Sequence, residues 1–183
     1  MNRTFKTVAS SNIGISELML PSHKNFSGKI HGGYILSLLD QIAFARASKF
    51  SGNYCVTVSV NTVNFLKPIE VGELVTMKAS VNYVGKSAMV IGIRVKAENI
   101  QTGIIKHCNS SYFTMVAKDE QGNSMHVPGL ILSFKNEVRR FCNCIKQIEL
   151  KKEKELREEK FDYNSLEVLK NLKNYNIKLA IQD

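Results

Sequence analysis

The 183-residue chain lacks several features that define whole classes of protein. It has no apolar run near the ~18 residues of a membrane-spanning helix, so we expect no membrane span. Its first residues contain no apolar stretch typical of a secretory signal. It has no G-x-S-x-G nucleophile elbow, no internal repeat and no low-complexity linker. With 44% hydrophobic and 22% charged residues, its composition is that of an ordinary globular protein.

Cysteine is scarce, with four residues and no obvious disulfide framework. Cys55 and Cys108 lie within apolar strand patterns and are predicted to be small buried hydrophobic residues. Cys142 and Cys144 form a C-x-C pair, whereas zinc sites usually use C-x₂₋₄-C with further ligands. No second Cys/His pair accompanies them, so we expect no metal. Scattered thiols indicate a reducing compartment, and we predict a cytoplasmic location.

The net charge is +9. From Lys135 onward the chain has 12 Lys/Arg and 9 Asp/Glu, a net of +3, so the preceding body carries a net of +6. A positive body suits a polyanionic small ligand or nucleic acid, although a Lys-rich composition without any partner explains it equally well. The C-terminal segment alternates charge signs, which disfavours nucleic-acid binding through it.

Hydrophobic periodicity predicts one helix and five strands. Tyr34 to Phe50 is apolar on most faces, which is typical of a buried helix, and Gly52 supplies a stop signal. A phase slip near Asn61-Thr62 predicts a β-bulge. The predicted strands cover residues 15–20, 56–65, 74–84, 89–97 and 104–117.

A single helix covers a sheet of this size only if the sheet curls around it. We therefore predict an α+β hot-dog fold over residues 15–130, preceded by an N-terminal arm at 1–14. Its sheet would leave an edge strand that dimerisation could pair. Residues 131–183 are predicted to be a charged helical extension, with helices within 135–160 and 165–172.

Asp40 is the anomalous residue, because it lies inside the most apolar helix of the chain. It could face solvent, form an ion pair or lie at an interface. Gly32 and Gly33 open the same helix, and free N–H groups in a first helical turn can act as an oxyanion hole, although a plain turn is the alternative. Eight residues of helix span about 12 Å, so a second subunit would be needed to bring a carboxylate to these glycines.

Three nearby polar residues have competing interpretations. The amide of Asn25 could hold a water or a thioester oxygen, or Asn25 could form an ordinary Asx-turn. His23 and His31 raise the possibility of a Ser/Cys–His triad. Because the chain has no nucleophile elbow, His31 is predicted to pack or hydrogen-bond near the turn.

The run Asn25-Phe-Ser-Gly28-Lys-Ile30-His31-Gly32-Gly33, followed by Asp40, resembles the N-x-x-G-x-[IL]-x-G-G…D signature of hot-dog acyl-CoA thioesterases. The cytoplasmic acyl-CoA hydrolase branch is the most similar, and the resemblance covers about residues 15 to 130. Three further stretches also look like that branch: the region from Val63 to Glu73, Gly85-Lys86-Ser87, and Tyr112 to Asp119.

This resemblance implies a homodimer or a hexamer of dimers, in which Asn25 of one subunit and Asp40 of its neighbour share a site. Asp40 would be general base or nucleophile, with the N–H of Gly32, or alternatively Gly33, polarising the thioester carbonyl. Gly85, Lys86 and Ser87 match a stretch beside bound CoA. Arg139 and Arg140 are candidate CoA contacts on charge alone.

The predicted activity is hydrolysis of acyl-CoA to a fatty acid and free CoA, with no metal or redox cofactor. A non-catalytic acyl-CoA sensor on the same fold is the main alternative. No helix-turn-helix output segment precedes the domain, which disfavours it. A hot-dog dehydratase or hydratase is a second alternative, but its usual pairing of a histidine with an acid is not visible.

Overall fold

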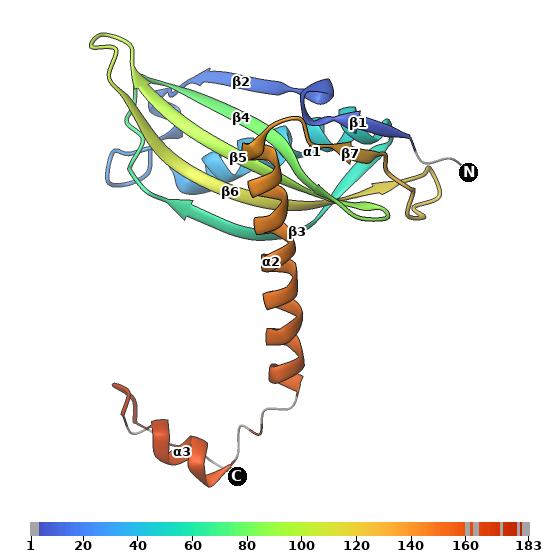
Figure 1. Cartoon of the computed structure of the whole chain (residues 1–183). Helices are drawn as coiled ribbons and strands as arrows, with labels where there is room; N and C mark the ends of the chain where they lie inside the picture. The colour runs from blue at the N-terminus through green and yellow to red at the C-terminus, as the bar shows by residue number, and fades with distance from the viewer. Residues whose placement is uncertain (1–3, 160–161, 163–164, 173, 179, 181–183) are drawn as a thin grey trace. The chain divides into compact units, whose positions relative to one another are not determined.

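The structure is a computed structural model that describes residues 4–159, 162, 165–172, 174–178 and 180. It has two compact units, which divide between Cys144 and Ile145. The first unit contains the sheet and its central helix; the second contains most of the C-terminal helical segment (Figure 1). Within the residues that the structure describes, none of the helices combines the length and apolarity needed to cross a membrane.

The first unit is an antiparallel five-stranded sheet in the order β2-β4-β5-β6-β3. Helix α1 (Gly32–Ser51) contacts all five strands, and the long strands curl around it (Figure 1). This is the α+β hot-dog arrangement that the sequence predicts. The strands are β2 (Ile13–Leu18), β3 (Tyr54–Phe65), β4 (Glu73–Val84), β5 (Ala88–Asn99) and β6 (Ile105–Lys118).

The core lies between α1 and the inner face of the sheet. Side chains in β4 alternate in burial as predicted up to Val81. In β5 the predicted alternation holds from Ile93 to Ala97, with Arg94 and Lys96 exposed on the outer face, whereas residues 89–93 are all buried. Gly52 ends α1 in the left-handed conformation (φ 77°), which is accessible to glycine without steric cost. The largest buried apolar side chains are Met19, Ile35, Leu39, Ile42, Phe50, Val75, Met77, Met89, Ile91, Phe113 and Met115.

Three features differ from or extend the prediction. The first strand of the main sheet ends at Leu18 and not at residue 20, because the chain turns into the 3₁₀ segment Pro21–His23. The predicted bulge is present between Val60 and Thr62, and a second register shift lies between Thr57 and Ser59. A small parallel pair, β1 (Phe5–Thr7) with β7 (Gly129–Ile131), was not predicted.

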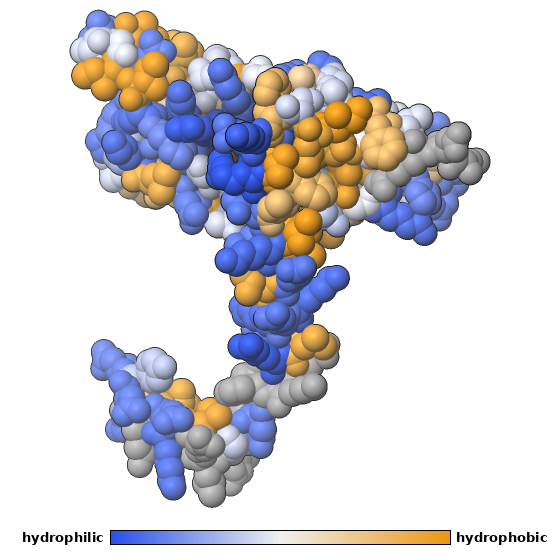
Figure 2. Space-filling view, viewed as in Figure 1, coloured by the Kyte–Doolittle hydropathy of each residue, from blue (hydrophilic) through white to orange (hydrophobic). Residues whose placement is uncertain are grey.

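The C-terminal segment forms α2 (Lys135–Glu159) and α3 (Leu166–Leu172), as predicted. The first turns of α2 belong to the first unit, where the Phe141 ring lies 5.2 Å from the Tyr83 ring. Residues 145–158 present mostly exposed, hydrophilic side chains, whereas the first unit carries a continuous apolar patch on the face shown (Figure 2). Further along α2, exposed i,i+4 pairs such as Lys151–Glu155 are formed, and such pairs contribute little stability.

Candidate active site

One face of α1 is exposed in the single chain, and the prediction of a helix buried on nearly all faces is wrong in this respect. The exposed residues recur at helical spacing, and Leu36 and Phe44 among them are 37% and 38% exposed. Residue type alone does not distinguish an apolar side chain that packs in the core from one that is exposed in the single chain and could be covered by a second copy. We call this set the α1 stripe: Gly33, Leu36, Ser37, Asp40, Gln41 and Phe44.

Asp40 lies on the α1 stripe and is exposed in the single chain. Its Oδ1 accepts a hydrogen bond from Thr57 Oγ1 on β3, at 2.6 Å. Of the alternatives for Asp40, an ion pair within the chain is not formed among the residues that the structure describes. The carboxylate is therefore oriented by one hydroxyl, and its remaining lone pairs are available to a substrate or water.

Thr57 is a candidate site residue that sequence reasoning missed. It occurs in an alternating strand pattern in which every second residue is polar, so its type alone carries no signal. Thr57 lies on edge strand β3, and only the packing of β3 beside α1 places its hydroxyl against Asp40.

The N-terminus of α1 distinguishes the two glycine amides. The His31 ring caps the helix, with Nδ1 accepting a hydrogen bond from Gly33 N at 2.9 Å. Tyr34 N donates to the His31 carbonyl at 3.0 Å. Among the described residues, Gly32 N–H has no hydrogen-bond partner, so Gly32 is the free donor of this turn. The prediction that His31 hydrogen-bonds near the turn is confirmed.

A ring stack and a hydrogen bond, both made by Tyr34, hold this turn in place. His23 stacks on Tyr34 with the ring centroids 3.9 Å apart. The Tyr34 hydroxyl donates a short hydrogen bond to Glu17 on β2. This hydrogen bond, with burial, raises the pKa of Tyr34 to about 12, so the phenol stays a donor at neutral pH. Neither His23 nor His31 is positioned as the base of a triad by these contacts.

Asn25 closes a tight loop just before the helix. Its Oδ1 accepts hydrogen bonds from Ser27 N at 2.9 Å, Ser27 Oγ at 2.8 Å and Lys29 N at 3.2 Å. The Asx-turn is therefore real, and it fixes the side chain rather than competing with a functional role. Among the described residues, the Asn25 Nδ2 group has no partner, and it remains a donor for a ligand.

The predicted CoA-contacting turn lies far from this loop in the same chain. Gly85, Lys86 and Ser87 join β4 to β5 beyond Val84, whereas the Asn25 loop is attached to the opposite end of β4 through the bridge between Lys29 and Glu70. The 12 residues of β4 span about 35 Å. One ligand could contact both turns only if two copies of the chain contribute one each.

The two arginines are exposed, and only Arg140 has a defined contact. Its Nη1 donates to Ser80 Oγ on β4 at 3.3 Å, which places it on the outer face of the sheet. Arg139 makes no hydrogen bond or ion pair among the described residues.

Replacing Gly33 with alanine is expected to give a free energy of unfolding about 1 kcal/mol lower than replacing Gly32, because both variants gain the helix propensity of alanine and only the first loses the cap. A Cβ at Gly33 would lie 2.9 Å from His31 Nδ1 and Cε1, so the imidazole must leave the amide. Gly32→Ala is the matched control, because its Cβ would only touch the Phe65 ring at 3.5 Å. Thermal unfolding of both variants measures the difference, and equal changes would contradict the capping role.

The four cysteines are free thiols of unequal accessibility. Cys55, Cys108 and Cys144 are buried, and burial raises the pKa of Cys144 to about 11, whereas Cys142 is exposed. We expect a thiol reagent at neutral pH to modify the Cys142 thiol rapidly in the folded protein, and all four cysteine thiols after denaturation. Cys142→Ser should abolish the rapid phase. A rapid phase that persists in this variant would show that a buried thiol reacts.

Comparison with known proteins agrees with this fold. Residues 27–104 match the family model described as Thioesterase superfamily. The chain is 38% identical over 148 residues to Protein VdlD of Helicobacter pylori, covering 81% of this chain and 84% of that protein. A solved hexameric acyl-CoA thioesterase is 30% identical with a TM-score of 0.80, over 82% of this chain and 97% of that one.

A Staphylococcus aureus acyl-CoA hydrolase, solved with butyryl-CoA, CoA and CoA disulfide, is also similar. It is 27% identical with a TM-score of 0.78, covering 85% of this chain and 95% of that one. Three further structures of that enzyme carry alanine in place of an asparagine, an aspartate and a threonine. These residues are spaced by 15 and then 17 positions, the same spacing as Asn25, Asp40 and Thr57.

The helix-and-curled-sheet architecture defines a hot-dog protein. The chain belongs to the thioesterase superfamily, among the acyl-CoA thioester hydrolases.

Proposed function

We propose that the protein hydrolyses acyl-CoA, converting the thioester and water into a fatty acid and free CoA. The observation that carries this proposal is the Asp40 carboxylate, which is exposed on the α1 stripe and oriented by the Thr57 hydroxyl. As general base, Asp40 would take a proton from water as the water oxygen attacks the thioester carbon. As nucleophile, it would attack that carbon itself, and water would then cleave the resulting anhydride. Both routes release CoA thiolate, which takes up a proton.

Two amide donors would stabilise the oxygen that becomes negative in the transition state. Gly32 N–H is free at the positive end of the α1 dipole, and Asn25 Nδ2 is the free end of a fixed side chain. Because Gly33 N–H is occupied by His31, Gly32 is the better-placed oxyanion donor. The site requires no metal, since a carboxylate and two donors supply the general acid–base and electrostatic terms.

The active site would be shared between two copies of the chain. Asp40 lies two helical turns from Gly32, about 12 Å along α1, which is too far for both to act on one carbonyl. The α1 stripe and edge strand β3, with Val58 61% exposed, form adjoining surfaces that a second copy could cover. We infer a dimer, assembled further as in the hexameric relative. A mass measurement in solution tests this assembly.

We further propose that CoA lies along the neighbouring subunit's Gly85-Lys86-Ser87 turn. Lys86 is exposed, and small residues on both sides permit close approach of a phosphate. Arg140 of α2 is hydrogen-bonded to Ser80 on β4, the strand that leads into this turn. Arg140 and its neighbour Arg139 are therefore candidate contacts for the nucleotide. All four cysteines are free thiols, which supports a reducing, cytoplasmic location.

A thiol-release assay with acyl-CoAs of several chain lengths tests the activity. The assay should use the Cys142→Ser variant, because the exposed Cys142 thiol of the unmodified protein would react with the thiol reagent and add to the signal. Release that depends on protein concentration and on Asp40 supports the proposal. If no acyl-CoA in the panel is hydrolysed, the proposal fails, and a titration with acyl-CoA then tests whether the chain is a binding module.

Thr57→Val is expected to lower kcat about ten-fold while the fold stays intact. The change keeps the shape of the side chain but removes a hydrogen bond to a charged group, worth about 1.5 kcal/mol. Thr57→Ser restores the hydroxyl and should recover most of the rate. Steady-state kinetics of the two variants give the comparison; equal rates for serine and valine would exclude this role for the hydroxyl.

A further inference from the structure

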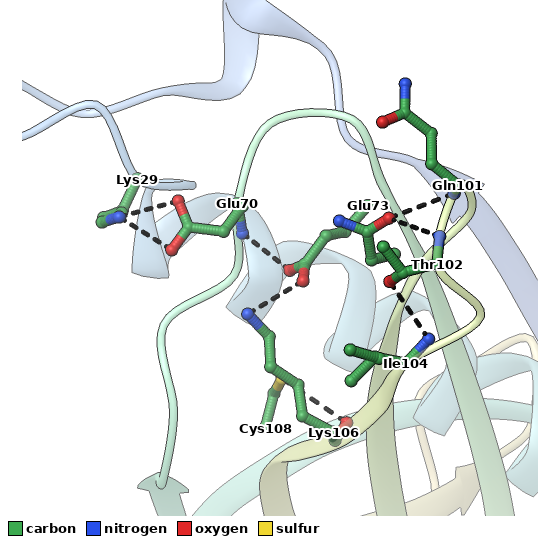
Figure 3. Close-up of polar contacts among 9 residues, drawn as sticks. Lys29, Glu70, Glu73, Gln101, Thr102, Ile104, Lys106 and Cys108 are labelled. Atoms are coloured by element: carbon green, nitrogen blue, oxygen red, sulfur yellow. Dashed lines mark hydrogen bonds and ion pairs between the residues drawn. The ribbon is translucent and has the colours of Figure 1, made fainter.

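A buried carboxylate lies at the start of β4, outside the residues assigned above. Glu73 is only 7% exposed, and both of its carboxylate oxygens are engaged. Its Oε1 pairs with Lys106 Nζ on β6 at 2.9 Å, and its Oε2 accepts a hydrogen bond from Glu70 N at 2.8 Å. Figure 3 shows these contacts as consecutive links between β6 and the turn before β4.

The links continue from this turn toward the Asn25 loop. Both carboxylate oxygens of Glu70 accept from Lys29 Nζ at 2.7 Å (Figure 3). The two backbones are also joined, by the antiparallel bridge between Lys29 and Glu70 and by the hydrogen bond from Ile30 N to Ile69 O at 2.9 Å. Lys29 in turn closes the Asn25 loop, because Asn25 N donates to Lys29 O at 2.7 Å and Lys29 N donates to Asn25 Oδ1.

Of the linked residues Lys106, Glu73, Glu70 and Lys29, the buried Glu73 is the one held most firmly. The Lys29–Glu70 pair is partly exposed and contributes little by itself. Glu73 is different, because a desolvated carboxylate must keep its partners, and its bond to the Glu70 amide is charge-assisted. Glu73 therefore fixes the backbone of residues 70–73, and the backbone bridge and the ion pair between Glu70 and Lys29 together transmit that position to the loop.

We propose that Glu73 is a positioning residue for the hydrolysis reaction, acting through Glu70 and Lys29 to hold the Asn25 amide in place. This inference rests on the proposed function, in which Asn25 Nδ2 contacts the thioester oxygen. A shift of the loop would misalign that donor in the transition state more than it would weaken CoA binding, since the nucleotide contacts lie elsewhere. The expected signature is a loss in kcat with little change in KM.

Two measurements on the whole 183-residue chain test the proposal. Hydrogen exchange of a peptide covering residues 24–31 reports the loop without reference to activity. Glu73→Gln and Glu73→Ala should both raise exchange there and lower kcat, by about ten-fold for glutamine and more for alanine, with KM changed less than about three-fold. Glutamine retains an acceptor for the Glu70 amide, which is the reason for this order.

Lys29→Gln provides a second test, because it removes the partly exposed Lys29–Glu70 ion pair and leaves the buried Glu73–Lys106 pair intact. It should also raise exchange in residues 24–31, even if the Glu73 variants fail to fold. Glu155→Gln, which removes an exposed pair in α2, is the control and should change neither measurement.

Unchanged exchange in residues 24–31 in the folded variants would overturn the proposal. Raised exchange with unchanged kcat would also overturn it, because the reaction would then not depend on the loop position. If the unmodified protein hydrolyses no acyl-CoA, the proposed function fails on that result alone. The exchange data still decide whether Glu73 holds the loop.

Discussion

Asp40→Ala is expected to reduce acyl-CoA turnover by a factor on the order of 10²–10⁴, the range for removal of a positioned general base. CoA binding should be retained, because the predicted nucleotide contacts at Lys86 and Arg140 lie on other elements. The fold should also be retained, because Asp40 and Thr57 are both exposed in the single chain, and the Thr57 hydroxyl keeps Met115 Sδ as a partner at 3.3 Å. Turnover and CoA titration on the same preparation separate the two effects.

Two further variants sharpen this test. Asp40→Asn keeps an acceptor for Thr57 Oγ1 and removes only the charge and basicity, so it should be nearly as inactive as alanine. Glu158→Ala removes an exposed carboxylate from α2 and should have wild-type rates. Turnover like that of the unmodified protein in either Asp40 variant would remove this carboxylate from the mechanism.

The sheet was predictable from the sequence because its strands are long and alternate. In β4 and β5, five or more alternating apolar residues each specify one inner face, and a shift of one residue would expose all of them. The turn at Gly85-Lys86-Ser87 and the stop at Gly52 use residues with strong local preferences. These signals are local, so a single sequence contains them.

The parts that were not predicted depend on contacts between distant segments. The pairing of β1 with β7 joins residues more than a hundred positions apart, and three-residue strands show no period. Arg46 follows the apolar spacing of α1 and is fully buried, where it donates a short hydrogen bond to the Val8 carbonyl. Burial lowers the pKa of Arg46 to about 10. The residues around Arg46 in the sequence do not indicate that the Val8 carbonyl will accept a hydrogen bond from it.

The candidate site was predictable by residue type but not by arrangement. Asp40 stands out because an acid in an apolar helix is unusual, and Gly32-Gly33 because it opens that helix. Which amide is free depends on the rotamer of His31, and which hydroxyl orients the acid depends on the packing of β3 beside α1. Leu36 and Phe44 of the α1 stripe are of the same residue types as the core, so their exposure became visible only once the fold was known.

Mixing two inactive variants should restore activity if the site is shared between copies. Asn25→Ala removes one oxyanion donor and is expected to lose a factor of 10²–10³, and Asp40→Ala loses the base. When subunits re-pair at random, half of the dimers are mixed. Each mixed dimer has one site with both residues intact and one with neither, so about a quarter of the original sites should work.

The experiment requires co-refolding, or co-expression with two affinity tags so that the mixed dimer can be isolated. Isolated mixed dimers should have about half the activity of the unmodified protein. A matched mixture of Asp40→Ala with Asp40→Asn should stay inactive, since no pairing supplies the carboxylate. If Asn25 and Asp40 instead act within one chain, no mixed dimer contains an intact site, and the first mixture would stay as inactive as the second. The roughly 12 Å of helix between Asp40 and Gly32 favours the shared site, because one carbonyl cannot reach both from a single chain.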